Sequence, residues 1–262
     1  MRKIGINLYA RKGLTLAEYI DYIKNLGFDS VFAMQRPTPV LVEAAELLAK
    51  AGMCFETVHA PFREANDIWL EGEAGDRWLE VLLGGVDACT VVGAPISVVH
   101  LSSGQKPPCI NELGRARLTK LVDYAASKNV SIAFENTRKI GMLGWALEEF
   151  EEAENVGFCL DTGHEACFTP GKELLPVFGD RLICTHIHDN NMLQDQHYIP
   201  FEGQIDFERV MSQIKKCGYE GSLMLEVMGT KPIYDDITDE EYLDRAAKAI
   251  KRLRDMIDGP IA

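Results

Sequence analysis

Short apolar runs alternate with longer amphipathic stretches along the whole chain, and turn residues mark the start of each unit. Stretches such as 16–27 and 112–129 repeat apolar residues at helical spacing and end in Gly or Asn, as helices often do. The segment 239–257 supplies an eighth helix. The predicted strands are Lys3–Leu8, Ser30–Ala33, Cys54–His59, Ser97–His100, Ser131–Glu135, Gly157–Asp161, Leu182–His186 and Ser222–Glu226.

Eight alternations of strand and helix predict an α/β protein, a (β/α)8 TIM barrel that forms a single domain over residues 1–262. A doubly wound open sheet is the alternative, but no GxGxxG motif follows an early strand. No internal repeat, low-complexity tract or linker divides the chain. A hydrophobic fraction of 47% and a charged fraction of 26% are typical of a globular protein of this kind.

Charge and cysteine usage indicate a cytoplasmic protein that acts on small molecules. The formal net charge of -13 makes nucleic acid an unlikely main partner, because general affinity for phosphate backbones needs a basic surface. No apolar run is long enough for a membrane span, and the start MRKIGINLYARKG resembles a first strand more than a signal peptide. The seven cysteines are dispersed without a CxxC motif, so we expect small core side chains in a reducing compartment.

Six consecutive predicted strands, from the third to the eighth, end on a side chain that can bind a metal. The carboxyl ends of parallel barrel strands open on one face, so these side chains should converge there. One such residue alone is more often an ordinary hydrogen-bonded polar group, but six in register favour a shared site. Buried carboxylates are costly without a cation, and His with carboxylate suits Mn, Co, Zn or Fe(II). The six residues are His59, His100, Glu135, Asp161, His186 and Glu226.

Further candidates follow the strand ends. His188 lies on the same side of an extended chain as His186, and it could be a ligand, a substrate contact or a partner of a ligand. We favour the last of these roles. Nucleophilic catalysis and phosphate loops are not indicated, because neither GxSxG nor GxxxxGK[ST] occurs. The additional residues are His164 in DTGH, and His188, Asp189, Asp195 and His197 in HIHDNNMLQDQH.

The motifs VHAP, FEN, LDTGH, HxxD, DxH and LEV, in this order, resemble the xylose-isomerase-like TIM-barrel superfamily. That superfamily holds sugar isomerases and epimerases and also the endonuclease IV enzymes. The epimerase pattern implies one divalent metal (Mn, Co or Zn) held by Glu135, Asp161, His186 and Glu226. It implies isomerisation or epimerisation of a sugar, sugar phosphate or sugar acid through a metal-stabilised enediolate, with Glu135 and Glu226 transferring the protons. The epimerase pattern is compatible with a homo-oligomer.

The endonuclease IV pattern implies a different activity, a zinc phosphodiesterase that cleaves DNA at abasic sites. The acidic balance counts against it, as does the lack of any basic residue between Arg181 and Arg209. Ketose epimerases usually carry an arginine in that stretch, so their substrates are in doubt too. A non-catalytic barrel that binds a sugar or metal is the third alternative. The endonuclease IV pattern implies three zinc ions. The first would be held by His59, His100 and Glu135, the second by Glu135, Asp161, His186 and Glu226, and the third by His164, Asp195 and His197.

Loops on the predicted open face add two further features. The long loop 61–76 carries Phe62 and Trp69, which would stack on a sugar, form a lid or pack against a neighbouring loop. Basic residues follow most strands, and together they would make a cationic rim suited to a sugar phosphate or sugar acid. These basic residues are Arg11, Lys12, Arg36, Arg63, Lys106, Arg138, Lys139 and Lys231.

Overall fold

Eight parallel strands form the barrel, in the order β7-β6-β5-β4-β3-β2-β1-β8. The computed structural model describes residues 1–9 and 13–259, so Arg11 and Lys12 of the predicted rim lie outside the described part. Ile187 pairs with Leu225 and thereby joins the last two strands, which confirms the predicted TIM barrel. The strands are β1 (Ile4–Asn7), β2 (Ser30–Met34), β3 (Cys54–His59), β4 (Ile96–Val99), β5 (Ser131–Glu135), β6 (Val156–Asp161), β7 (Leu182–His186) and β8 (Leu223–Leu225).

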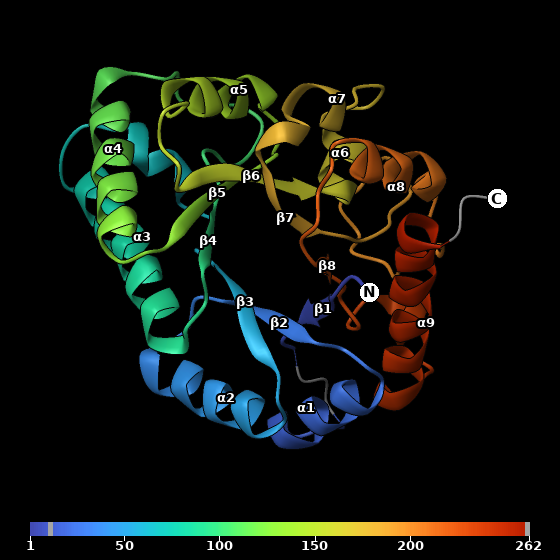
Figure 1. The fold of residues 1–262 in the computed structure, drawn as a ribbon. Coiled ribbons are helices and arrows are strands. Elements are labelled where there is room, and N and C mark those ends of the chain that lie inside the picture. Colours follow the sequence, from blue (N-terminus) through green and yellow to red (C-terminus); the bar gives the residue numbers. More distant parts are fainter. Residues whose placement is uncertain (10–12, 260–262) are drawn as a thin grey trace.

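Helices surround the strands as an outer ring (Figure 1). Local signals in the sequence set several of their ends: Thr15 and Glu18 form a capping box at the start of the first helix, and Gly93 ends the third in a left-handed conformation. The helices are α1 (Leu16–Asn25), α2 (Thr38–Lys50), α3 (Glu73–Val92), α4 (Glu112–Ser127), α5 (Ile140–Glu149), α6 (Thr162–Phe168), α7 (Leu175–Phe178), α8 (Phe207–Lys216) and α9 (Asp239–Asp258), with short 3-10 helices η1 (Ala65–Trp69), η2 (Gly179–Arg181) and η3 (Pro232–Tyr234).

Two of the six strand ends that carry metal-competent side chains need correction. β4 stops at Val99 and β8 stops at Leu225, so His100 and Glu226 lie one residue beyond their strands. The helix α6 also begins directly after Asp161, whose side chain accepts a hydrogen bond from the backbone of His164 at 2.6 Å. An Asp at the N-cap, the residue just before a helix, stabilises the helix in this way. DTGH is therefore a strand-to-helix junction, and it holds His164 close to Asp161.

The core has two parts that follow from the barrel geometry. The larger part lies between strands and helices, and a small cluster inside the barrel contains Val98, Ala133, Cys159 and Cys184. Three cysteines are buried, as predicted, but Cys54 and Cys109 are exposed, so the prediction of core cysteines is wrong for these two.

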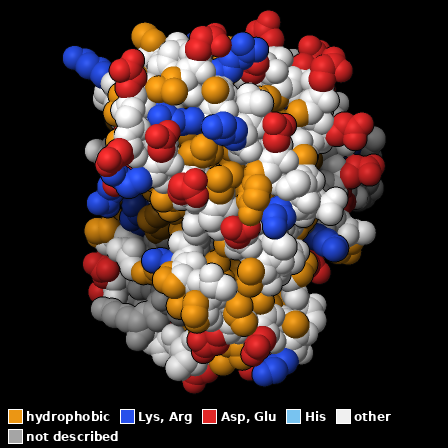
Figure 2. Space-filling view, turned by 90° about the vertical axis from the view of Figure 1, so that its left-hand side faces the viewer, with side chains coloured by type: hydrophobic (Ala, Val, Ile, Leu, Met, Phe, Trp, Pro, Cys, Tyr) orange, Lys and Arg blue, Asp and Glu red, His pale blue; other side chains and the backbone are white. Residues whose placement is uncertain are grey.

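The outer surface over α2, α3 and α4 carries acidic and basic side chains interspersed with hydrophobic ones (Figure 2). This side of the molecule therefore has no uniformly basic face of the kind that nucleic-acid binding needs. None of the helices in the described residues is both long and apolar enough to span a membrane.

Candidate metal centre

Glu135, the last residue of β5, lies among four imidazole rings. Its Oε2 is 2.9 Å from Nε2 of His59, 3.2 Å from Nε2 of His100 and 3.3 Å from Nδ1 of His186. Its Oε1 is 3.1 Å from Nδ1 of His164. Burial would raise the pKa of Glu135, but His100 and His186 outweigh it and hold the pKa well below its usual range. The carboxylate is thus kept ionised at the centre of the cluster.

Two more carboxylates and His186 complete the group around Glu135. Glu226 Oε2 is 3.3 Å from Nδ1 of His186. One ligand atom from each of Glu135, Asp161, His186 and Glu226 lies within 4.8 Å of the others. Burial and the nearby charges of Glu135 and Asp161 raise the pKa of Glu226 well above its usual value. Three carboxylates so close together repel one another, and a bound cation would remove that repulsion.

Backbone contacts orient three of the histidines toward the cluster. Nδ1 of His59 is 2.6 Å from the carbonyl of Ala60, and Nδ1 of His197 is 3.0 Å from the carbonyl of Glu226. Nδ1 of His164 is 2.9 Å from the carbonyl of Asn136. A carbonyl only accepts hydrogen bonds, so in the neutral rings Nδ1 carries the proton and Nε2 is free to bind a metal.

Several buried polar atoms of the cluster have no hydrogen-bond partner among the described residues. They are Nε2 of His100, Oε1 of Glu135, Oδ2 of Asp161, both ring nitrogens of His186, Nε2 of His188 and Oδ1 of Asp195. Such atoms are costly when nothing binds them. Since they belong to oxygen and imidazole donors, the residues present fit a divalent metal.

A second group of charges adjoins the first. Asp195 Oδ1 is 3.3 Å from Nε2 of His197 and 3.5 Å from Nε2 of His188, and Oδ2 is 3.3 Å from Nε2 of His164. Burial opposes ionisation of Asp195, but the adjacent rings of His164 and His197 prevail and lower its pKa. His188 is also 3.1 Å from Asp161 Oδ1. Its predicted role as a partner of a ligand agrees with this contact and stays a prediction, since His188, His197 and Glu226 also form a possible ligand group.

Asp189 and Asn136 have positions that the sequence did not assign. Asp189 is buried and accepts hydrogen bonds from the backbone of Phe201, Gly203 and Ile205, so it shapes the loop that carries Asp195 and His197. Asn136 exchanges two hydrogen bonds with the backbone of Asp161 and fixes the ends of β5 and β6 together. Its place directly after Glu135, in FEN, was the only signal available.

The cluster borders a cavity of about 460 Å³ at the carboxyl ends of the strands, which is lined on another side by apolar residues such as Leu8, Met34 and Leu41. A smaller cavity of about 300 Å³ adjoins it. Phe62 lines both cavities and stacks on His100 with ring centroids 5.0 Å apart. Trp69 instead packs in the core against Trp145, so a lid or a substrate contact is wrong for this residue.

The predicted cationic rim forms only in part. Arg36 lines the larger cavity, and Arg63 and Arg138 line the smaller one. The three predicted lysines in described loops, which line neither cavity, are Lys106, Lys139 and Lys231.

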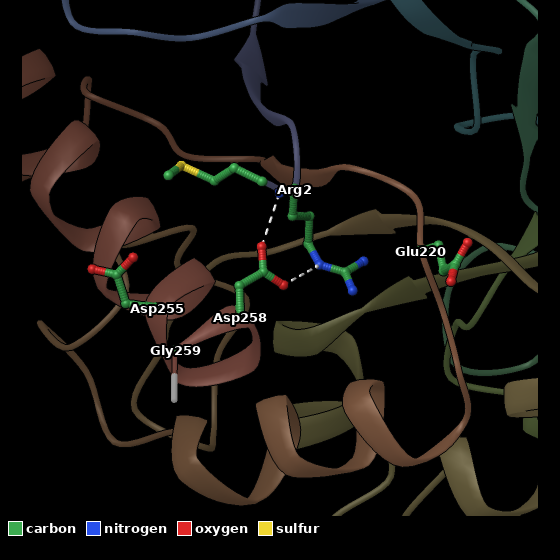
Figure 3. Close-up of a pocket in the computed structure, with 6 residues that line it drawn as sticks. Arg2, Glu220, Asp255, Asp258 and Gly259 are labelled. Atoms are coloured by element: carbon green, nitrogen blue, oxygen red, sulfur yellow. Dashed lines mark hydrogen bonds and ion pairs between the residues drawn. The ribbon is translucent and has the colours of Figure 1, made fainter. Parts of the chain in front are cut away.

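A third cavity, of about 720 Å³, lies near the opposite end of the barrel, beside the start of β1 and the end of α9. Figure 3 shows Arg2 reaching Asp258 there, with Glu220 and Asp255 further away. Arg2 is paired with Asp258 at 3.6 Å and donates to the carbonyl of Gly221 at 2.8 Å. No histidine lines this cavity, so it offers no comparable metal site.

Comparison with known proteins identifies relatives of two kinds. The chain is 34% identical to a probable endonuclease 4 of Cenarchaeum symbiosum, over 71% of this chain and 74% of that protein. It is 28% identical to the uncharacterized protein y4fM of Sinorhizobium fredii, over 68% of this chain and only 61% of that protein. The fold is similar to that of D-allulose 3-epimerase from Methylomonas sp., solved with D-allulose, with a TM-score of 0.77, 18% identity and 98% of each chain covered.

The family model described as "xylose isomerase-like TIM barrel" matches residues 20–256, nearly the whole chain. The match covers the strands that carry all the metal-competent strand ends, from His59 to Glu226. The protein belongs to the xylose isomerase-like TIM barrel family.

Proposed function

We propose that this protein is a metal-dependent isomerase or epimerase of a small sugar, sugar phosphate or sugar acid. The observation that carries the proposal is the convergence of Glu135 and Glu226 with Asp161 and His186 in one possible ligand group, from which the two glutamates line the larger cavity. A cavity of about 460 Å³ suits a substrate the size of a monosaccharide. The shared fold with a sugar epimerase supports the proposal.

Glu135, Asp161, His186 and Glu226 would hold the metal, with Mn, Co and Zn as the candidates. When bound, a divalent metal supplies positive charge next to the oxygens of an α-hydroxy carbonyl and so makes the adjacent C–H bond more acidic.

Glu135 and Glu226 would move the protons. Glu135 ends β5 and Glu226 follows β8, so the two carboxylates reach the cavity from different parts of the barrel wall. One can remove the proton next to the carbonyl while the other returns a proton to the opposite face. His59 and His100 contact Glu135 and would keep its carboxylate oriented.

The test is exchange of deuterium from solvent into candidate sugars by the metal-loaded protein. Glu135→Gln and Glu226→Gln keep the side-chain size but remove the base, and each should slow exchange by at least about 100-fold. Glu56→Gln is the matched control, since Glu56 lies on β3, accepts a hydrogen bond from the Ser30 hydroxyl and is not part of the cluster. Exchange at the normal rate in Glu135→Gln would rule out its role in proton transfer. A barrel that only binds sugar or metal would show no exchange at all.

A zinc phosphodiesterase is the second candidate, and one specific observation favours it. His164, Asp195 and His197 lie together beside the first cluster, with both imidazole-to-carboxylate distances at 3.3 Å. Contacts link all nine positions of the endonuclease IV pattern in one cluster, and an endonuclease 4 relative is 34% identical.

Metal analysis and an incision assay separate the two candidates. About one metal per chain favours the isomerase, and about three zincs favour the phosphodiesterase. Incubation of the zinc-loaded protein with a duplex that contains an abasic site should give no incision if the isomerase proposal is right. Incision that Asp195→Asn abolishes would replace that proposal with the phosphodiesterase.

A further inference from the structure

The smaller cavity, of about 300 Å³, opens directly from the metal centre. It shares His100, His164 and Asp195 with the larger cavity. Most of the rest of its wall comes from the loops after β3, β4 and β5, which contribute Arg63, Ser102, Thr137 and Arg138, and Phe168 of α6 completes it. A ligand that reaches the metal centre can therefore extend into this cavity.

The arginines of this cavity differ from most others in the described residues. Seven arginines elsewhere form ion pairs with carboxylates. Arg181 donates to backbone carbonyls, and Arg252 lies over the ring of Phe201. Arg63 and Arg138 make no ion pair or side-chain hydrogen bond with any described residue, and neither do Arg36 in the larger cavity and Arg252 on α9. In a protein with 40 acidic residues, two unpaired guanidinium groups at one cavity indicate a site for an anion.

Phe168 holds Arg138 in place without using its hydrogen-bond donors. The guanidinium carbon of Arg138 lies 3.5 Å from the centroid of the Phe168 ring, and this ring also stacks on His164 with centroids 4.7 Å apart. Stacking fixes the plane of the guanidinium, while its N–H groups stay available at the edges. Arg138 is thus oriented next to a histidine of the metal centre.

Two buried hydroxyls add neutral donors. Ser102 and Thr137 are 2% and 9% exposed, and their oxygens lie 3.4 Å apart. Each hydroxyl carries one proton, and their mutual contact uses only one of the two. One hydroxyl donor therefore remains for a ligand, beside the two arginines.

We propose that this cavity binds a terminal anionic group of the substrate, a phosphate monoester or a carboxylate, while the reacting carbons lie at the metal centre. The inference rests on the proposed function, and it specifies the orientation of the bound substrate. Its charged end lies between the loops after β3, β4 and β5, and its reacting end lies against Glu135 and Glu226. A cavity of this size holds an end group better than a polymer strand.

The experiment measures binding of inorganic phosphate and of acetate to the purified, metal-containing protein by calorimetry. Arg138→Met and Arg63→Met should each weaken binding of the preferred anion by about tenfold or more, because a charge-assisted hydrogen bond is lost. Arg252→Met is the matched control. It also removes an arginine stacked on a phenylalanine, at 3.8 Å, but far from this cavity, and should bind as the wild type does.

Metal analysis of each variant shows whether the variants carry the same amount of metal. At equal metal content, an anion held by the metal alone would bind equally well to all variants, so a loss of binding is due to the arginine. Thr137→Val provides a milder change and should weaken phosphate binding without affecting folding. Preference for phosphate would indicate a sugar phosphate as substrate, and preference for acetate a sugar acid.

Unchanged affinity for both anions in Arg63→Met and Arg138→Met would overturn the inference. So would a short single-stranded oligonucleotide that binds more tightly than phosphate and depends on Arg138, since it would indicate a polymer ligand. The assay requires no turnover. If the arginine variants lose phosphate while no sugar exchanges deuterium, the anion site stands and only the isomerase proposal fails.

Discussion

Gly163 shows how one missing side chain shapes the candidate metal centre. It follows Thr162 at the start of α6, and a Cβ atom there would meet the ring of His188. That ring lies 3.1 Å from Asp161 and stacks on His197 with centroids 4.0 Å apart. The absence of a side chain at position 163 therefore permits the contact between His188 and Asp161.

Gly163→Ala should push His188 away from Asp161. We expect metal affinity to fall by about 10- to 100-fold, as when the partner of a ligand is lost, and stability to fall by about 1–3 kcal/mol from overpacking. Competition with a metal-binding dye and urea unfolding measure the two effects. Gly141→Ala is the control, because no atom lies within 4 Å of its Cβ position in α5, and it should leave metal binding unchanged. Normal metal affinity in Gly163→Ala would show that His188 does not support Asp161.

The cysteines give a second prediction at the level of single residues. Burial raises the pKa of Cys89 to about 12, so at pH 8 only about one thiol in 10,000 is ionised. Cys109 is exposed. Mass spectrometry after labelling with a thiol reagent at pH 8 should find Cys109 modified and Cys89 unmodified until urea is added. Equal labelling rates in the folded protein would contradict the buried position of Cys89.

At the level of elements, the loop after β3 is held by a buried arginine of α4. Arg117 donates to the carbonyls of Ile68 at 2.9 Å and Leu70 at 2.6 Å, and it pairs with Asp76 at 2.9 Å. Trp69 in the same segment donates to another backbone carbonyl. These contacts fix the base of the loop that brings Phe62 and Arg63 to the cavities.

Arg117→Met should destabilise the protein by about 2–4 kcal/mol, because buried carbonyls lose their donors. Arg115→Met removes an arginine from the same helix whose ion pairs are solvent-exposed, and it should cost no more than about 1 kcal/mol. Denaturant unfolding of both variants gives the comparison. If the two midpoints coincide, the loop does not depend on Arg117.

For the whole molecule, the proposed metal joins distant parts of the barrel. Its four proposed ligands come from β5, β6 and β7 and from the residue after β8. A ligand that binds only the folded state stabilises it, by about 2.7 kcal/mol at 100 times its dissociation constant. For a chain of this length, that corresponds to a shift of roughly 5 °C in melting temperature.

Chelator should therefore lower the melting temperature of the protein by about 5 °C or more, and Mn, Co or Zn should restore it. Differential scanning calorimetry with and without chelator measures the shift. In Asp161→Asn the same treatment should have a much smaller effect, because that variant has already lost a ligand. A wild-type protein that melts at one temperature in both conditions would show that no metal contributes to the folded state.

The sequence by itself determined the architecture and which candidate residues lie at the carboxyl ends of the strands. Periodicity is a local property of the chain, so eight apolar runs and the helices between them were readable, and four of the six strand-end residues close their strands as predicted. The strands that precede His100 and Glu226 end one residue earlier than predicted. Hydrogen bonding between neighbouring strands, and not the apolar pattern, decides where a strand stops.

Only the tertiary structure decided how these residues are arranged. Distances among Glu135, His164 and Asp195 depend on barrel closure and loop paths, which are set by packing over the whole chain. The same packing buried Trp69 and left Arg63 and Arg138 without carboxylate partners beside the candidate metal centre. Local pattern thus predicts which residues end at the open face. Close packing between segments far apart in sequence determines which of them meet and which keep their charge free for a ligand.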